Sequence, residues 1–269
     1  MTHVSDAMKK SEGDWLGPPK ELGGGPKLVE MRAAPKRKEL PVLDPTDVNY
    51  SQAVVTWHDA SGRISEQYRA LRIRLMAHFK DKPFAIIVTS AHRGEGKTVT
   101  CVNLAFALAA QRELRTALVD CDFRRNGVAT LLHDKSPLGL ADVLRGQVSL
   151  DEVIRPTPFA NLSVVPAGRT ARDEACELAS RGELDDVVRY LRRSYECVLF
   201  DTPPTSTLCD AGAVGRVAGE AMLVVRMNRT QRESVAEAIR HFNAINVNVV
   251  GLVLTGQKFF IPKYLYRYS

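Results

Sequence analysis

Three clusters of polar residues in this chain contain side chains that could bind phosphate and a divalent cation. The first is a glycine-rich stretch whose central residues are Gly94, Glu95, Gly96, Lys97 and Thr98. Glycines let the backbone N–H groups turn inward around an anion, a lysine at this position adds a mobile positive charge, and the following hydroxyl can bind Mg²⁺. This spacing therefore predicts a site for a nucleoside triphosphate and its metal ion.

The sequence on either side of this stretch favours the same interpretation. An apolar run at 84–88 precedes it and an alanine-rich amphipathic run at 99–111 follows, so the glycines lie between a strand and a helix N-terminus, which attracts phosphate. Ala91 stands where the usual spacing has its first glycine, and the alternative is an ordinary turn with a solvated lysine. We predict nucleotide contacts from one continuous run: Arg93, Gly94, Glu95, Gly96, Lys97, Thr98 and Val99.

The second cluster is a pair of aspartates, Asp120 and Asp122, at the end of a second apolar run. Their spacing points both carboxylates to one side of a strand, and the carboxyl ends of parallel strands form the ligand crevice of such sheets. The pair could hold Mg²⁺ and accept a proton from an attacking hydroxyl. The alternative is a local turn in which an aspartate caps the chain as it leaves the strand.

The third cluster follows the apolar run 197–200 and contains Asp201, after which Pro203 and Pro204 end the strand. This is the position of a Walker B aspartate, which holds Mg²⁺ or its water shell. Asp210, a little further along, is expected to cap the next helix, because aspartate is a common N-cap residue.

Apolar runs and amphipathic stretches alternate through most of the chain, which predicts an α/β fold with a mostly parallel sheet flanked by helices. We expect strands at 84–89, 116–121, 162–166, 197–201, 220–226 and 249–255. We expect helices at 61–79, where Ile64, Tyr68, Leu71 and Leu75 recur at helical spacing, and at 97–111, 138–145, 182–194, 209–218 and 232–245.

Composition narrows the class of protein. The chain has 269 residues, 45% of them hydrophobic, with a formal net charge of +6 and no long run of Lys or Arg, so nucleic acid is not the predicted partner. No apolar run approaches the length of a membrane span, which predicts a cytoplasmic protein. The odd number of cysteines and their apolar surroundings predict buried thiols rather than disulfides: Cys101, Cys121, Cys176, Cys197 and Cys209.

The two ends differ in composition from the middle. Residues 1–60 are rich in Gly, Pro and charged residues and are expected to form a disordered arm, in which 54–57 could be a short edge strand or a docking segment. The main domain is expected to span 61–256. The tail, 257–269, contains no acidic residue and carries three alternating tyrosines, Tyr264, Tyr266 and Tyr268.

Taken in order, the three clusters resemble those of the MinD/ParA-like P-loop ATPases and, more closely, those of the bacterial tyrosine kinases (BY-kinases) of capsular and exopolysaccharide biosynthesis. Two further features favour the kinases: Glu66, Arg69 and Arg72 match that family's ExxRxxR motif, and the tyrosine tail matches its terminal cluster. The resemblance covers about residues 61–269. His92 stands where the positioning ATPases carry an additional lysine, which argues against that sister family.

The resemblance implies an ATP-dependent protein-tyrosine autokinase with a P-loop NTPase fold and with ATP and Mg²⁺ as cofactors. It implies that Lys97, Asp120, Asp122 and Asp201 form the catalytic group, and that Thr98 joins Asp122 and Asp201 around the metal. Asp120 is the expected acceptor of the tyrosyl proton, with Asp122 the alternative.

The resemblance also implies partners. Glu66, Arg69 and Arg72 would lie at the interface of a ring-like homo-oligomer, and the tail tyrosines would be phosphorylated by a neighbouring subunit. Because no membrane span is evident, a separate membrane activator of the polysaccharide export type would hold the protein at the inner face of the membrane. Two alternatives remain open: a positioning ATPase that phosphorylates no protein, and a non-catalytic nucleotide-dependent scaffold.

Overall fold

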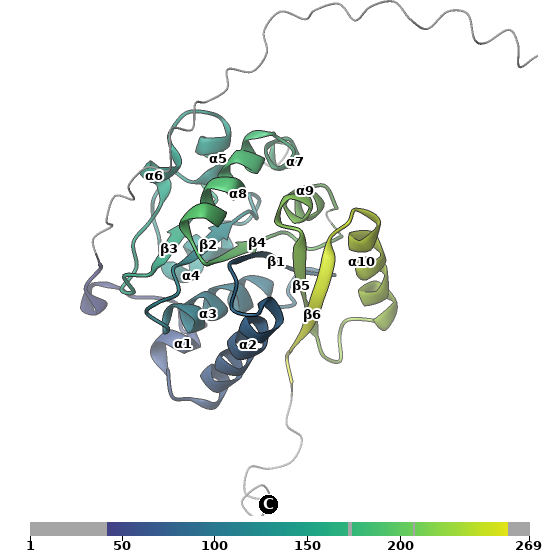
Figure 1. The fold of residues 1–269 in the computed structure, drawn as a ribbon, viewed down its shortest axis with the longest axis horizontal. Coiled ribbons are helices and arrows are strands. Elements are labelled where there is room, and N and C mark those ends of the chain that lie inside the picture. The colour runs from purple at the N-terminus through teal and green to yellow at the C-terminus, as the bar shows by residue number, and fades with distance from the viewer. Residues whose placement is uncertain (1–41, 172–173, 207, 258–269) are drawn as a thin grey trace, which may run out of the picture. The chain divides into compact units, whose positions relative to one another are not determined.

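The computed structural model describes residues 42–171, 174–206 and 208–257, and the tail tyrosines therefore lie outside the described residues. Within this part of the chain six strands form one sheet, in which every pairing is parallel and the order is β3-β2-β4-β1-β5-β6 (Figure 1). The predicted strands and the α/β class are confirmed. The strands are β1 (Phe84–Ser90), β2 (Thr116–Asp120), β3 (Leu162–Val165), β4 (Cys197–Asp201), β5 (Glu220–Arg226) and β6 (Asn248–Thr255).

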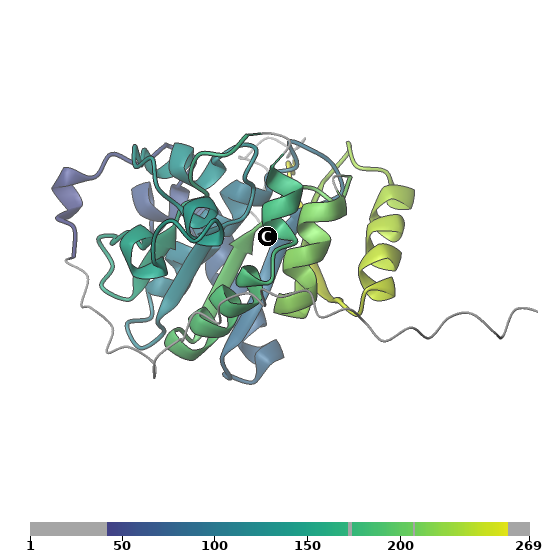
Figure 2. The same ribbon diagram turned by 90° about the horizontal axis from the view of Figure 1, so that it is seen from above.

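Helices cover both faces of the sheet (Figures 1 and 2). One face packs against α1 (Val55–His58), α2 (Arg63–Phe79), α3 (Lys97–Ala109) and α4 (Gly127–Leu132). The other packs against α5 (Leu140–Leu144), α6 (Leu150–Val153), α7 (Ala175–Ala179), α8 (Glu183–Ser194), α9 (Leu208–Ala218) and α10 (Arg232–Ala244). A 3₁₀ turn, Pro45–Asp47, precedes them.

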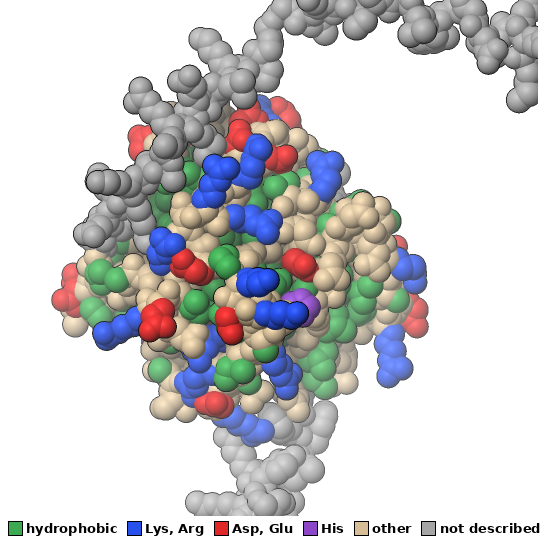
Figure 3. Space-filling model, in the orientation of Figure 1, with side chains coloured by type: hydrophobic (Ala, Val, Ile, Leu, Met, Phe, Trp, Pro, Cys, Tyr) green, Lys and Arg blue, Asp and Glu red, His purple; other side chains and the backbone are tan. Residues whose placement is uncertain are grey.

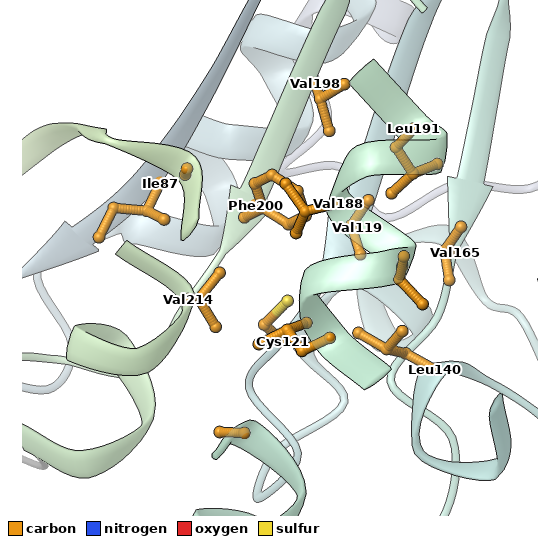
Figure 4. Close-up of a cluster of buried hydrophobic side chains, with 14 of the residues drawn as sticks. Ile87, Val119, Cys121, Leu140, Val165, Val188, Leu191, Val198, Phe200 and Val214 are labelled. Atoms are coloured by element: carbon orange, nitrogen blue, oxygen red, sulfur yellow. The ribbon is translucent and has the colours of Figure 1, made fainter. Parts of the chain in front are cut away.

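The central strands are buried along their whole length, and most of their residues are apolar, because both of their faces are covered. Every residue of β1 is buried, and so is every residue of β2 and β4. Figure 4 shows how the second face is filled: Phe200 of β4, Val188 and Leu191 of α8 and Val214 of α9 belong to one buried cluster, in which Phe200 lies beside Val188. A continuous apolar run is the expected signature of such a strand. The edge strand β6 instead leaves Leu252 and Leu254 exposed.

The register of the sheet brings the chemical groups together. Asp120 at the end of β2 pairs with Asp201 at the end of β4, and Val88 of β1 pairs with Asp201 from the other side. The glycine-rich stretch begins directly after β1. Because the strands are parallel, their carboxyl ends meet at the same edge of the sheet, and all three polar clusters lie there.

The expected boundary at residue 60 is wrong, because the segment 43–60 is part of the folded domain. Tyr50 and Val54 are buried at 5% and 0% exposure against the α2–α3 face, and residues 55–58 form a helical turn rather than a strand. Asn103 of α3 holds this segment: its Oδ1 accepts the N–H of Thr56 at 3.0 Å and its Nδ2 donates to the carbonyl of Ala53 at 2.9 Å. These contacts join residues about 50 positions apart, which composition cannot reveal.

One smaller expectation also fails. Helix α9 begins at Leu208, so Asp210 lies inside its first turn and not at the N-cap. The expected helix over 61–79 is confirmed as α2, although Ile64 at its start is 59% exposed. The buried repeat is carried by Tyr68, Leu71 and Leu75.

Cys101, Cys121 and Cys197 are buried thiols without disulfides, as predicted, whereas Cys176 also forms no disulfide but is only half-buried. The side chain of Cys209 lies outside the described residues. Among the described helices, none is both long enough and apolar enough to cross a bilayer. Over the described residues of the face in Figure 3, Lys and Arg side chains are interspersed with acidic ones rather than gathered in a continuous basic stripe.

The buried Asn103 gives a test of the packing of the 43–60 segment. Asn103→Ala leaves the N–H of Thr56 and the carbonyl of Ala53 without their partner, so we expect the free energy of unfolding to fall by about 1–3 kcal/mol. Urea denaturation measures this change. Asn243→Ala, at an exposed position of α10, is the matched control and should change stability by less than about 0.5 kcal/mol. Equal effects of the two substitutions would contradict the packing described here.

Candidate functional site

The glycine-rich loop between β1 and α3 has the shape of an anion cradle. Gly94 and Gly96 adopt positive φ angles of 79° and 95°, a region that residues with a Cβ avoid. Among the residues that the structure describes, none accepts a hydrogen bond from the backbone N–H groups of residues 93–96. Helix α3 begins at Lys97, so its positive end faces the same space. The loop can therefore hold phosphate, as the sequence predicts.

Lys97 lies between two carboxylates at the neighbouring strand ends. Its Nζ is 2.8 Å from Oδ2 of Asp122 and 3.5 Å from Oδ1 of Asp201, and its side chain is only 10% exposed. Burial alone would lower the pKa of Lys97, but the charges of Asp201 and Asp122 raise it above its usual value. Lys97 is thus a buried ammonium group that balances the charge of the acidic cluster.

Thr98 and Asp201 form the second contact of the cluster. The Thr98 hydroxyl donates to Oδ2 of Asp201 at 2.7 Å, and Oδ1 of Asp201 is buried and accepts no hydrogen bond from any described residue. Burial raises the pKa of Asp201 to about 6, although the Lys97 charge and the Thr98 hydroxyl lower it. Among the described residues, Oδ1 of Asp201 has only the ion pair with Lys97 at 3.5 Å, and beside a hydroxyl and a second carboxylate it belongs to the oxygen-rich donor set that Mg²⁺ prefers. The residues present fit a magnesium ion.

Asp120 shapes the turn after β2. Its carboxylate is fully buried and accepts the N–H groups of Asp122 at 2.9 Å and Val128 at 3.0 Å. Burial raises its pKa well above the usual range, and the nearby charge of Asp201 adds to the shift. Asp120 is therefore a carboxylate with increased basicity, and it lies opposite Asp201 in the pairing of β2 with β4.

Not every predicted nucleotide contact faces the cradle. The side chain of Glu95 is 2% exposed and is engaged by His92 and Thr230, so only its backbone can serve a phosphate group. Sequence reasoning missed Thr230, Arg226 and the contribution of Thr255 to this loop. Their positions in the sequence could have indicated this role. These residues lie at or just after the carboxyl ends of β5 and β6, which is the edge of the sheet where the site lies.

The motif on α2 is divided between two roles. Glu66 and Arg69 form an ion pair with each other at the surface, whereas Arg72 donates to the carbonyl of Ala107 in α3 at 2.9 Å. Ile73 is 60% exposed and lies on the face of Glu66 and Arg69 by its helical spacing. Arg72 therefore joins α2 to α3, the helix that begins at Lys97. The face of α2 that points away from the core carries Glu66, Arg69 and Ile73.

A cavity of about 560 Å³ opens beside the loop, on the side of α10. Ala91 and His92 line it, together with Thr205 after β4 and Glu237 and His241 of α10. It lies next to the phosphate cradle and is large enough to admit an aromatic side chain.

Comparison with known proteins agrees with this geometry. The sequence model of the AAA domain family matches residues 84–249, from β1 into β6. The tyrosine-protein kinase YwqD of Bacillus subtilis is 30% identical over 195 residues, which cover 72% of this chain and 81% of that kinase. The chain belongs to the bacterial tyrosine-protein kinases. Membership makes it an enzyme of the protein-tyrosine kinase class, as predicted from the motifs.

Other relatives are much longer than the chain described here. The tyrosine-protein kinase Wzc of Salmonella typhimurium is 30% identical over 190 residues, or 70% of this chain, but the match spans only 26% of Wzc. Among solved structures, the BceF tyrosine kinase domain is 30% identical with a TM-score of 0.67, over 76% of this chain and 81% of that domain. The MinD protein of Pyrococcus horikoshii, solved with Mg-ADP, shares the fold: TM-score 0.56, 24% identity, and 64% and 70% of the two chains.

The charge of Lys97 gives a pH-dependent test of the cluster. The pKa of Asp201 is about 6 in the folded chain and near 4 in an unfolded one, so ionising Asp201 costs stability as pH rises through this window. Lys97→Met removes the charge that lowers this pKa, so the cost becomes larger. We expect the loss of unfolding free energy to be about 1–2 kcal/mol greater at pH 8 than at pH 5.

Urea denaturation of the nucleotide-free protein at the two pH values measures this difference. Lys82→Met, at an exposed position before β1, is the control and should show the same small effect at both. A loss caused by Lys97→Met that does not change with pH would contradict the proposed charge balance.

Proposed function

We propose that this chain is an ATP-dependent tyrosine autokinase that phosphorylates Tyr264, Tyr266 and Tyr268 of a neighbouring copy. The observation that supports this most directly is the convergence of Lys97, Asp122 and Asp201 at one edge of the sheet, next to a loop whose N–H groups are directed to no described acceptor. This arrangement positions a triphosphate and neutralises its charge, which is most of what phosphoryl transfer requires.

The proposed cofactors are ATP and Mg²⁺. The oxygens of Thr98, Asp122 and Asp201 would hold the metal ion, which supplies charge neutralisation to the phosphates. Lys97, now in contact with both carboxylates, would turn its ammonium group toward the phosphates when the nucleotide is bound. The backbone of residues 93–99 would surround the phosphate chain. The structure of MinD with Mg-ADP supports this assignment through the shared fold.

The acceptor of the tyrosyl proton is proposed to be Asp120, with Asp122 as the alternative. A tyrosine hydroxyl has a pKa near 10, so a base with a raised pKa is better matched to it than an ordinary carboxylate. The transferred proton would pass to the carboxylate as the tyrosyl oxygen forms its bond to the γ-phosphorus and the bond to ADP breaks.

The proposed activity is tested by mass spectrometry of the purified full chain after incubation with Mg-ATP. We expect phosphate on the peptide that contains the three tail tyrosines, and its loss of about 100-fold or more in Lys97→Met, which removes the phosphate-neutralising charge. Replacing all three tyrosines by Phe should abolish tail phosphate but leave Mg-ADP binding unchanged. If the wild-type tail gains no phosphate while the protein still binds nucleotide, the kinase proposal fails and the positioning ATPase remains.

Transfer between copies requires an oligomer, and we propose that the exposed face of α2 forms its interface. Glu66 and Arg69 give this face a pair of opposite charges and Ile73 adds an exposed apolar side chain. Phosphorylation of the tail would add about −1.5 to −2 charges per tyrosine and loosen the ring. We further propose a role in polysaccharide export and attachment to the inner face of the membrane through a separate activator, by analogy with the relatives.

The interface proposal predicts a change in molecular mass. Light scattering should show a larger assembly for the dephosphorylated protein than for the phosphorylated one, because the added negative charges repel one another. Glu66→Ala combined with Arg69→Ala should give the smaller species in both states. Arg74→Ala, also exposed on α2 but on another side, is the control and should leave the mass unchanged. Identical masses before and after phosphorylation would refute the cycling model.

A further inference from the structure

Residues that are remote in the sequence hold the side of the phosphate-binding loop that faces β5 and β6. The carboxylate of Glu95 is nearly fully buried, its Oε2 accepts the N–H of His92 at 3.0 Å, and its Oε1 accepts the hydroxyl of Thr230 from the turn after β5. A buried carboxylate without such partners would be costly, so these donors fix its position. Glu95 thus joins the loop to the strand pair β5–β6.

The backbone of the same loop is held by two further groups. The hydroxyl of Thr255, the last residue of β6, donates to the carbonyl of Glu95 at 2.6 Å. The Nη1 of Arg226, the last residue of β5, donates to the carbonyl of Gly94 at 2.9 Å. Both strand ends are themselves joined, because the N–H of Met227 donates to the carbonyl of Thr255 at 2.9 Å. Two successive carbonyls of the loop are therefore directed toward β5 and β6.

The direction of a carbonyl decides the direction of an N–H. Because the peptide group is planar and trans, its C=O and N–H point opposite ways. The carbonyl of Gly94 belongs to the same peptide as the N–H of Glu95, and the carbonyl of Glu95 to the same peptide as the N–H of Gly96. Because these carbonyls are held toward β5 and β6, the N–H groups of Glu95 and Gly96 point the other way, toward the phosphate cradle.

We propose that Glu95, Arg226, Thr230 and Thr255 form a clamp that sets the N–H groups of the loop for phosphate binding. They are positioning residues: their side chains act through the loop, whose backbone N–H groups, that of Glu95 included, would contact the phosphates. The proposal rests on the nucleotide site described above, and it assigns a role in ATP affinity to the ends of β5 and β6, which hold the loop through Arg226, Thr230 and Thr255.

The clamp predicts that removing either hydroxyl weakens nucleotide binding. In the full chain, Thr230→Val and Thr255→Val should each raise the dissociation constant for Mg-ADP by about 3- to 10-fold in isothermal titration calorimetry, the range expected for one lost hydrogen bond. Thr230→Ser and Thr255→Ser keep the hydroxyl and should stay within about twofold of the wild type.

A buried threonine elsewhere in the sheet provides the matched control. Thr116 of β2 is fully buried and its hydroxyl donates to the carbonyl of Leu114 at 3.4 Å, at the opposite end of the strand from Asp120. Thr116→Val makes the same chemical change and should leave the dissociation constant unchanged even if it lowers the melting temperature. A purely structural role for Thr230 and Thr255 would make their Val variants behave like this control.

Double variants separate the two parts of the clamp. Glu95→Gln replaces one acceptor oxygen by an NH₂ group, so it disturbs the bonds from His92 and Thr230 but leaves the carbonyl that Thr255 holds. Combined with Thr230→Val, its effect on the dissociation constant should be clearly less than the product of the single effects, because both remove one shared bond. Combined with Thr255→Val, the two effects should multiply.

The outcomes distinguish this proposal from the proposed function. Unchanged Mg-ADP affinity in Thr230→Val and Thr255→Val overturns the clamp, whether or not the tail is phosphorylated. Weakened affinity with rescue by Ser supports the clamp even if no tail phosphate is found, in which case only the kinase assignment fails. A wild-type chain that binds no Mg-ADP overturns both.

Discussion

The interaction on which the site depends is the attraction of one buried ammonium group, that of Lys97, for carboxylates at two strand ends. Asp122 and Asp201 lie in a space that excludes water, where uncompensated charges would be costly. Lys97 can balance them only because the register of β1, β2 and β4 brings their carboxyl ends together. The same groups are those that a triphosphate and its metal ion would engage, so the nucleotide-free protein holds its charged residues in position by pairing them with each other.

Contacts with the rest of the fold hold α3, which begins at Lys97, and the glycine-rich loop that precedes it. Arg72 of α2 and the 43–60 segment both hold α3, the helix that starts at Lys97, through Ala107 and Asn103. On the other side, the ends of β5 and β6 hold the loop that precedes it. The site is therefore supported by helices on one face of the sheet and by the ends of β5 and β6, and we propose that the affinity for nucleotide depends on these contacts outside the glycine-rich motif.

Much of this could be predicted from the sequence, for physical reasons. Buried parallel strands are continuous apolar runs, so all six were found within a residue or so of their ends, and the order of the three polar clusters identified the family. What could not be predicted depends on distant contacts. The segment containing Tyr50 and Val54 looks disordered by composition, because the residues that hold it lie on α3, far away in the sequence. The motif includes Glu95 among the nucleotide contacts, but it does not show that the side chain of Glu95 turns toward His92 and Thr230.

The anchoring of Thr255 also limits the geometry of any assembly. Tyr264 lies nine positions after Thr255 and Tyr268 thirteen positions after it, and a fully extended chain spans about 30 Å and about 45 Å over those distances in sequence. The phosphate-binding loop of a neighbouring copy can reach these tyrosines only if it lies within these distances of Thr255. The length of the tail therefore limits the distance between copies at which one copy could phosphorylate another. Tyr268, the tyrosine furthest from Thr255, could reach the most distant active site.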